Sequence, residues 1–372
     1  MRVKHRRATP GARERAPTTR RGALVFAFLA VISASAPGQA ASATAAPVLR
    51  VMVDSVARRV ILIAGPFDIP AAMPGMEGME HSMHHEHAHA DLLRLSWPVD
   101  GYLTGTAMDV RDASGKPIPS ALVHHTNMTN FDRRQLIYPE FEVLFAMGQG
   151  TTSIQLPRGV GVPLPMGEHL GLSIVWHNET GVLVSGAMLR LTMSYALKRD
   201  IRVAVLPFYV DVSNVAGGAN SFDIPAGRSR QEYRFTLPVS GRLIAVGGHL
   251  HDHGVSLRLA DVRSGKVLVK LKALHDSAGH VPATTSFVFG FHEDALKLEA
   301  DRQYRMVSDY DNRTGATIVD GATAHFLGIF EPQDISRLPP LDPSDSDFQK
   351  DLARFPLEVR ALAEAPRGGA PR

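Results

Sequence analysis

The residues of this sequence best suited to chemistry are histidines, which form small groups in both halves of the chain. Six of them stand as an adjacent pair, a single residue and an alternating row: His124, His125, His177, His249, His251 and His253. The chain has no cysteine, so a transition metal bound here would take imidazole, thioether or carboxylate ligands. The pattern therefore predicts a histidine-ligated copper or zinc site.

The spacing within each group limits how it can bind a metal. Residues two apart in a strand project from the same face, so His249 and His251 would form a chelating pair. His253 extends the row only if the strand continues past the residues around it, which are equally typical of a turn. His124 and His125 would face opposite sides of a regular strand, so both reach one metal only at a bulge or a strand end. The alternative interpretation is a solvated cluster of surface histidines.

The elements that carry these histidines belong to two halves of the sequence that repeat each other. A repeat period of about 140 residues is too long for a solenoid, so each copy is predicted to be a domain. The matching segments occur in the same order, pairing residues 66–71 with 221–226, 98–103 with 238–243, and 177–181 with 311–315.

The first copy carries an insertion rich in methionine and histidine. The connection from Pro70 to Pro98 is 15 residues longer than its counterpart from Pro225 to Pro238. We expect a mobile loop at residues 72–91, because so polar a tract cannot offset the entropy of packing. Thioethers suit Cu(I) and imidazoles suit Cu(II), zinc or nickel, so the loop is predicted to capture metal; the alternative is a solvated loop without a ligand. The candidate ligands are Met73, Met76, Met79, His81, Met83, His84, His85, His87 and His89.

Residues 1–40 have the pattern of a secretory leader. A basic segment precedes an apolar run at residues 22–32 and then a region of small residues, and the run is too short for a stable membrane span. The segment at residues 19–24 also permits a twin-arginine route. We therefore expect a protein exported to the periplasm or secreted, with no stable membrane span once the leader is removed.

The charge of the chain excludes one class of partner. Eight of the 40 basic residues and one of the 37 acidic residues lie in the leader. The remainder has 32 basic and 36 acidic residues and a net charge of −4. This balance gives no support for nucleic-acid binding.

The remaining sequence predicts an all-β fold. Short stretches of alternating apolar residues are separated by turn residues, and no long amphipathic helix precedes the C-terminal region. We expect two tandem antiparallel jelly-roll β-sandwich domains from an internal duplication, at residues 48–198 and 199–334. The proline-rich tail at residues 335–372 is predicted to be mostly disordered, with one short helix near residues 344–354.

The ordered set of histidines resembles a known family. An adjacent pair, a single histidine some fifty residues later and a His-x-His about seventy residues beyond it, on two exported jelly-roll domains, is similar to the copper type II, ascorbate-dependent monooxygenases. That group includes the peptidylglycine- and dopamine-hydroxylating enzymes, and the resemblance covers roughly residues 95–332. It implies that His124, His125 and His177 bind an electron-transfer copper, and that His249 and His251 bind an oxygen-binding copper. It further implies hydroxylation of an aliphatic C–H with O2 and a reductant such as ascorbate, across an open interdomain cleft.

The sequence departs from that family at one ligand. The family completes the oxygen-binding copper with a methionine about seventy residues beyond the His-x-His, and residues 320–325 of this chain contain none. Because a thioether tunes copper toward Cu(I), this departure bears directly on hydroxylase activity. The residues that could supply a further ligand are His253, His325 and Met306.

Three hypotheses follow from the sequence. The first is a copper-dependent monooxygenase, with one or two coppers per chain, acting on an unknown small molecule. The second is a noncatalytic protein that captures, stores or transfers copper. The third, ranked last, is a zinc hydrolase, since imidazole-bound zinc can activate water but no convincing general base accompanies the histidines. The sequence identifies no catalytic residue.

Overall fold

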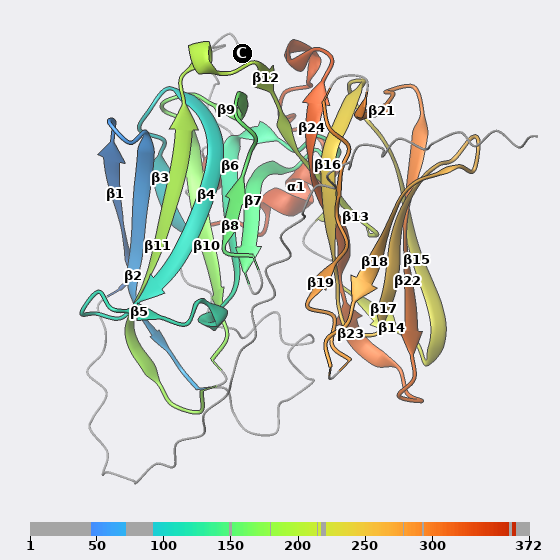
Figure 1. The fold of residues 1–372 in the computed structure, drawn as a ribbon, viewed down its shortest axis with the longest axis horizontal. Helices are drawn as coiled ribbons and strands as arrows, with labels where there is room; N and C mark the ends of the chain where they lie inside the picture. The colour runs from blue at the N-terminus through green and yellow to red at the C-terminus, as the bar shows by residue number, and fades with distance from the viewer. Residues whose placement is uncertain are drawn as a thin grey trace, which may run out of the picture. The chain divides into compact units, whose positions relative to one another are not determined.

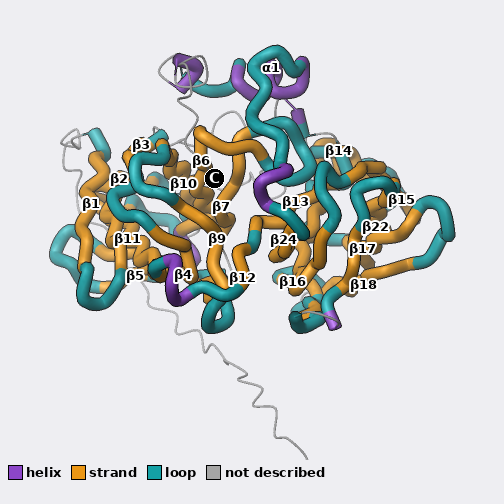
Figure 2. Tube along the Cα trace, turned by 90° about the horizontal axis from the view of Figure 1, so that it is seen from above, coloured by secondary structure: helices purple, strands orange, loops and turns teal. Residues whose placement is uncertain are grey.

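The computed structural model describes residues 46–71, 92–148, 151–178, 180–213, 215–216, 221–277, 279–291, 294–356 and 359–361. The predicted leader at residues 1–40 and the Met/His-rich insertion at 72–91 lie outside these residues. Residues 44–372 form one compact unit, and strands dominate its trace (Figure 2). Within the described residues, no helix is long and apolar enough to cross a membrane.

The first β-sandwich consists of two sheets (Figure 1). One sheet has the strand order β1-β2-β11-β4-β9-β12, with β5 and β8 paired to β4, and the other has the order β3-β10-β6-β7. Pairing is antiparallel except between the short strands β12 and β9. The bounds are β1 Val48–Asp54, β2 Arg59–Ile69, β3 Leu93–Ser96, β4 Gly101–Arg111, β5 Pro117–Ile118, β6 Val123–Arg134, β7 Phe141–Gly148, β8 Ser153–Gln155, β9 Val160–Leu164, β10 His169–Trp176, β11 Val184–Ala196 and β12 Val203–Ala204.

The second β-sandwich repeats this arrangement. One sheet has the order β13-β24-β16-β20, with β21 also paired to β16, the other has the order β15-β22-β17-β18-β19, and β14 pairs with β23. The bounds are β13 Leu206–Asp211, β14 Phe222–Ile224, β15 Gly227–Thr236, β16 Gly241–Leu250, β17 Gly254–Asp261, β18 Val267–Leu274, β19 Ala283–Thr284, β20 Phe287–Val288, β21 Leu296–Leu298, β22 Gln303–Asn312, β23 Ile318–Ala322 and β24 Ala324–Pro332.

The two sandwiches are copies of one another, which confirms the predicted duplication. The strands β2-β11-β4-β9 of the first correspond in order to β13-β24-β16-β21 of the second, and β3-β10-β6-β7 correspond to β15-β22-β17-β18. A buried asparagine just past the end of β10 and another at the end of β22, its counterpart, make the same bonds in both sandwiches. Asn178 Nδ2 donates to the Ile69 carbonyl at 2.9 Å, and Asn312 Nδ2 donates to the Ile224 carbonyl at 3.0 Å.

These asparagine contacts explain why the same Asn-x-Thr residues occur in both halves of the sequence. In each copy the asparagine Oδ1 accepts hydrogen bonds from the backbone and hydroxyl of a threonine two residues later, Thr180 or Thr314. The asparagine also donates to the carbonyl of the residue four positions on. Because a buried amide left without partners is costly, the Asn-x-Thr segment fixes the same strand connection in each sandwich.

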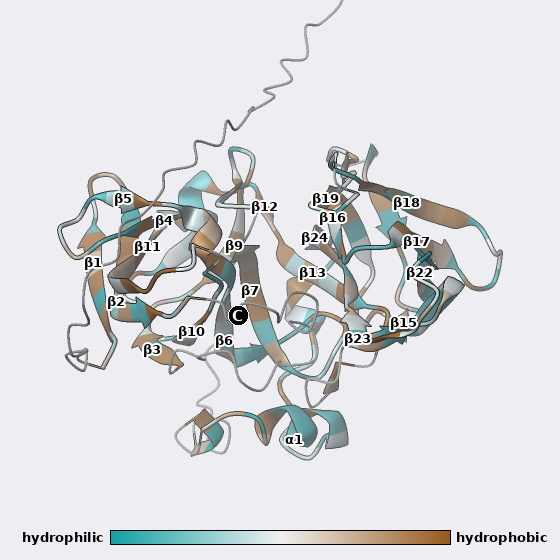
Figure 3. Ribbon diagram, turned by 90° about the horizontal axis from the view of Figure 1, so that it is seen from below, coloured by the Kyte–Doolittle hydropathy of each residue, from teal (hydrophilic) through white to brown (hydrophobic). Residues whose placement is uncertain are grey.

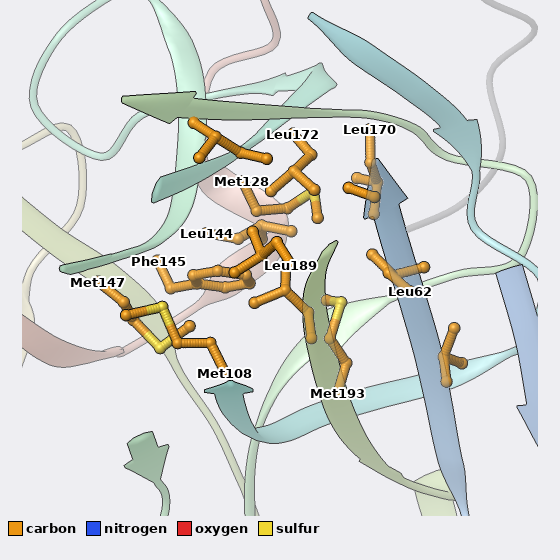
Figure 4. Packing of buried hydrophobic residues seen from close by; sticks show 14 of the residues in the cluster. Leu62, Met108, Met128, Leu144, Phe145, Met147, Leu170, Leu172, Leu189 and Met193 are labelled. Atoms are coloured by element: carbon orange, nitrogen blue, oxygen red, sulfur yellow. The ribbon is translucent and has the colours of Figure 1, made fainter. Parts of the chain in front are cut away.

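Each sandwich has its own apolar core, built by strands that alternate apolar and hydrophilic residues (Figure 3). The first core contains several methionines among its leucines, as Figure 4 shows for Met108, Met128 and Met193. Thioethers fill irregular gaps well, so these methionines act in packing. Ile244 of β16 belongs to the first core and Leu136 to the second, so the two sandwiches share packing.

The segment from residue 243 to 259 differs from the simplest prediction. If the alternation were unbroken from Leu243 to Leu259, these two residues would share one face with His249 and Leu257. In the structure, β16 ends at Leu250, and β17 begins at Gly254 in the opposite sheet. Leu243, Leu257 and Leu259 all belong to the second core, whereas His249 does not, because the register of β16 against β24 shifts between Leu243 and Ala245. The turn between the strands, one of the two alternatives at this point, resets the alternation.

The C-terminal tail is more ordered than predicted. A 3₁₀ turn at Ile335–Arg337 and helix α1 at Ser346–Leu352 lie in it, and the helix falls within residues 344–354, where the sequence predicts one. Phe348 and Leu352 are buried in a small cluster with Phe131 and Phe141 of the first sandwich. The prediction of disorder was wrong for this part of the tail, because its few aromatic and aliphatic residues have an apolar surface to cover. Residues 362–372 lie outside the described residues.

Candidate metal centre

His124 and His125 are the second and third residues of β6, and the local strand geometry allows their rings to meet. The register between β10 and β6 shifts so that Val175 pairs with His125 and Trp176 pairs with Val123. His124 is therefore the extra residue of a bulge, which is one of the two arrangements that the sequence predicts for this pair. The two ring centres lie 4.0 Å apart.

His177 joins this pair from the neighbouring strand. It follows β10 directly, and its backbone N–H donates to the Leu122 carbonyl at 2.8 Å, beside the start of β6. Its ring centre lies 5.8 Å from that of His124. The three histidines predicted for the first domain are thus together.

The second sandwich contributes a matching group. His249 is in β16, and its ring centre is 4.9 Å from that of His251. His325 is directly opposite His249 on the neighbouring strand β24, and their rings stack at 5.1 Å. His325, which the sequence offers only as a possible further ligand, is thereby the third imidazole of this group.

The two groups meet across the two sandwiches. The ring centres of His125 and His249 are 6.3 Å apart. We call the resulting unbroken row of ring contacts the histidine cluster; its members are His177, His124, His125, His249, His251 and His325.

The ring spacing can be compared with what a metal requires. Two imidazoles bound to one tetrahedral ion at about 2.0 Å have ring centres roughly 5 Å apart, and the spacings within each group are similar. As the side chains stand, however, no three histidine, aspartate or glutamate side chains of the described residues are arranged to hold a metal ion. The donor set fits copper or zinc by its chemistry, but metal binding would require some of the rings to rotate.

A buried carboxyl group lies behind His325. Asp211 Oδ2 is 3.8 Å from His325 Nδ1, and Asp211 also accepts hydrogen bonds from the Tyr209 hydroxyl at 3.2 Å and the Ser213 backbone at 2.9 Å. Burial raises the pKa of Asp211 to about 7, although these hydrogen bonds act in the opposite direction. The 3.8 Å separation is too long for a hydrogen bond, so Asp211 lies beside the His325 ring without holding it.

His325 itself is held in the neutral form. Burial lowers its pKa well below the usual histidine range, and the nearby His249 and His125 lower it further. Its Nδ1 is buried and has no hydrogen-bond partner among the described residues. A neutral imidazole with a buried, unsatisfied nitrogen is in the protonation state that a metal ligand needs.

Thr323 occupies the stretch where the resembled family has its methionine. The Thr323 hydroxyl is hydrogen bonded to His251 Nε2 at 3.0 Å, and the Tyr310 hydroxyl donates to the Thr323 carbonyl at 3.2 Å. The segment at residues 320–325 is therefore beside the His-x-His pair, but it brings a hydroxyl and a third imidazole in place of a thioether.

Two other candidate ligands lie elsewhere. His253 is in the turn after β16 with φ +67°, and its carbonyl accepts from the Asp311 backbone; no ring contact joins it to the cluster among the described residues. Met306 is fully buried in the core of the second sandwich. The candidate ligands of residues 72–91 lie outside the described residues.

Sequence reasoning missed the groups that surround the imidazoles. Tyr209, Asp211 and Thr323 contact the cluster but carry no recognisable motif. The one available signal was the position of Thr323 within the segment expected to supply a ligand. Asp211 comes from a strand far away in sequence, which only the paired strands β13 and β24 bring to His325.

The fold and the cluster define a tandem β-sandwich protein with histidines shared between its sandwiches. No protein-family model matches the sequence, and no curated protein is significantly similar to it. Among solved structures, the chain is similar to the major capsid protein P2 of bacteriophage PM2, with 9% identity, a TM-score of 0.37, and coverage of 68% of this chain and 95% of that one. It is also similar to the STIV MCP, with 9% identity, a TM-score of 0.38, and coverage of 77% of this chain and 97% of that one. A third match is PNGF-II, with 11% identity, a TM-score of 0.34, and coverage of 64% of this chain and 59% of that one.

Proposed function

We propose that this protein binds copper at the histidine cluster. The observation that carries the proposal is the unbroken row of six imidazoles contributed by both sandwiches. Six imidazoles gathered at one place supply several nitrogen donors that a shared metal ion could bind. In a chain without cysteine, imidazole ligands favour copper or zinc.

The proposal extends to a monooxygenase-like activity through the family resemblance. His124, His125 and His177 would hold one copper, and His249 and His251 would help to hold another. Copper in such a site supplies one-electron chemistry, with O2 and a reductant such as ascorbate as the co-reactants of hydroxylation. The protein's own contribution would be to fix the His251 ring through its hydrogen bond to Thr323.

A second candidate function is noncatalytic capture, storage or transfer of copper. The observation that favours it is the all-imidazole group of His249, His251 and His325, which lacks the thioether that tunes copper toward Cu(I). The Met/His-rich segment at residues 72–91 would then deliver metal to the cluster. Both functions fit a protein exported by its leader to the periplasm or beyond, and a zinc hydrolase ranks behind them.

The first test is the metal content of the mature chain after exposure to copper and zinc. We compare wild type with His249→Ala/His251→Ala, with His124→Ala/His125→Ala, and with a deletion of residues 73–89. His275→Ala/His280→Ala is the matched control, because both residues are exposed in the second sandwich and outside the cluster.

We expect about two coppers in the loop deletion and a loss of about one in each cluster variant, because each removes one of the two ligand groups. The control keeps the wild-type copper content. Retention of zinc alone, or loss of all copper with the loop, would rule out the two-site proposal. Ascorbate-dependent oxygen uptake by the copper-loaded chain then distinguishes a monooxygenase from a capture protein.

A further inference from the structure

A cavity of about 330 Å³ lies between the two sandwiches. Its walls come from β4, β7, β8 and β9 of the first sandwich and from β13, β16, β20 and β24 of the second. Phe145 and Leu144, visible in Figure 4, form part of the first wall. The volume lies within the range of small-molecule sites.

The chemistry of the lining is almost entirely apolar. None of the described residues around the cavity is charged, and the only side chains with a hydroxyl are Thr106, Tyr209 and Ser286. Tyr209 already donates its hydroxyl to Asp211. Since an ionised group buried without a partner is strongly disfavoured, the cavity selects against charged molecules.

The cavity and the histidine cluster lie on the same faces of two strands. In β16, Ala245 and Gly247 line the cavity, and His249 is the next residue on that face. In β24, Ile329 and Leu327 line it, and His325 follows on the same face. Two residues along a strand span roughly 7 Å, so the cavity ends beside the imidazoles. Tyr209 lies between the cavity and the histidine cluster, because it lines the cavity and its ring centre is 5.4 Å from that of His325.

We propose that this cavity binds an uncharged, predominantly hydrocarbon small molecule and presents one end of it to the histidine cluster. The inference rests in part on the proposed function, since that function would make the molecule a substrate of the metal centre. The cavity itself is a binding site whether or not metal is present. The ligand would place its apolar body against β7, β16 and β24, and any polar group would reach Thr106 or Ser286.

Gly247 offers a direct way to close the cavity. A Cβ added there would meet only the Ser286 Cβ, at 3.8 Å, so a side chain enters the cavity without a backbone clash. Gly247→Phe and, independently, Ala245→Leu should fill it. Val319→Phe is the control, because Val319 is 62% exposed in β23 and is not a lining residue.

The test uses the mature chain freed of metal and the uncharged fluorophore N-phenyl-1-naphthylamine. Wild type and Val319→Phe should bind it, 1-octanol should displace it, and octanoate at the same concentration should not. Both filling variants should weaken binding by at least about tenfold while keeping the wild-type circular dichroism and copper content. No binding by wild type, equal binding by all variants, or displacement by octanoate equal to that by 1-octanol would overturn the inference.

A second measurement separates this inference from the proposed function. With copper bound, 1-octanol should change the electron paramagnetic resonance spectrum of wild type but not that of Gly247→Phe. An unchanged wild-type spectrum would overturn the claim that the ligand reaches the cluster. A chain that binds the fluorophore in the cavity but no copper would refute the proposed function and leave the cavity assignment intact.

Discussion

One imidazole of the histidine cluster is oriented by a neighbour that is itself anchored. Thr323 is hydrogen bonded to His251, and Tyr310 holds Thr323 through its carbonyl. On the other side, Asp211 stands behind His325 while its own backbone N–H donates to the Tyr138 hydroxyl at 2.9 Å. Of these contacts, the hydrogen bond from Thr323 is the one that limits the orientations of a ring, that of His251.

Removing the Thr323 hydroxyl should therefore weaken the proposed metal binding without unfolding the protein. Thr323→Val keeps the size of the side chain but loses the hydrogen bond to His251, and such changes around a metal ligand typically cost about tenfold or more in affinity. Competition titration with a copper chelator measures the effect. Thr236→Val, at an exposed position of the same sandwich, is the control, and equal affinities for the two variants would contradict the orienting role.

Residue spacing alone predicted part of this site. The bulge at His124 was expected if the two adjacent histidines act together. Strand alternation predicted that His249 and His251 lie close together, although His251 lies one residue past the end of β16. The contact between His125 and His249 depends on how two sandwiches pack, and no local pattern encodes that. For the same reason Asp211 and Tyr209 were not found.

Among the elements, the C-terminal tail is the one whose order the sequence did not predict. Its composition is rich in proline and charge, but α1 places Phe348 and Leu352 over Phe131 and Phe141. Beneath it, Glu140 is 4% exposed and lies near Asp351 and Arg354. Burial, followed by repulsion from Asp351, raises the pKa of Glu140 to about 8, and burial also raises the pKa of Asp351.

The contact between the tail and β7 should weaken as the pH rises. Between the ordinary carboxyl pKa of 4.5 and the folded value of about 8, the folded chain binds more protons at Glu140 than the unfolded chain, so stability falls with increasing pH. Glu140→Gln should make the free energy of unfolding less dependent on pH. The change in that free energy between pH 4.5 and pH 8 should be smaller than in wild type by an amount on the order of a few kcal/mol. Urea unfolding from pH 5 to pH 8 measures it.

The matched control for that measurement is Glu232→Gln, which replaces an exposed glutamate. It should keep the wild-type pH profile. Hydrogen exchange of α1 adds an independent signal, since its amides should exchange faster at pH 8 than at pH 5 beyond the intrinsic rate change. Identical profiles for wild type and Glu140→Gln would show that the carboxyl group does not titrate within the fold in this range.

At the scale of the whole molecule, the sandwiches are joined without a spacer. β12 pairs with β9 of the first sandwich, β13 pairs with β24 of the second, and only Val205 separates them. Val205 is fully buried, and its N–H donates to the Gly161 carbonyl at 3.0 Å. The short joint and the shared packing hold His125 close to His249.

Lengthening this joint should uncouple the two copies. Four residues, Gly-Ser-Gly-Ser, inserted after Val205 should leave both sandwiches folded but replace one cooperative thermal transition with two. Any copper binding that needs histidines from both sandwiches should become weaker. Differential scanning calorimetry and chelator titration measure these effects. The same insertion after Gly265, in an exposed turn of the second sandwich, should change neither, and a single transition in the Val205 variant would refute the coupling.

The paired asparagines also bear on how the protein can be produced. Asn178 and Asn312 each begin an Asn-x-Thr acceptor sequence for N-linked glycosylation, which a eukaryotic secretory pathway reads while the chain is still emerging. A glycan would be attached at Nδ2, the atom that donates to Ile69 or Ile224 in the finished fold, at sites only 3% and 1% exposed. Sugar at either position would prevent the strand connection from closing. Recombinant work on this chain therefore belongs in a host that does not glycosylate.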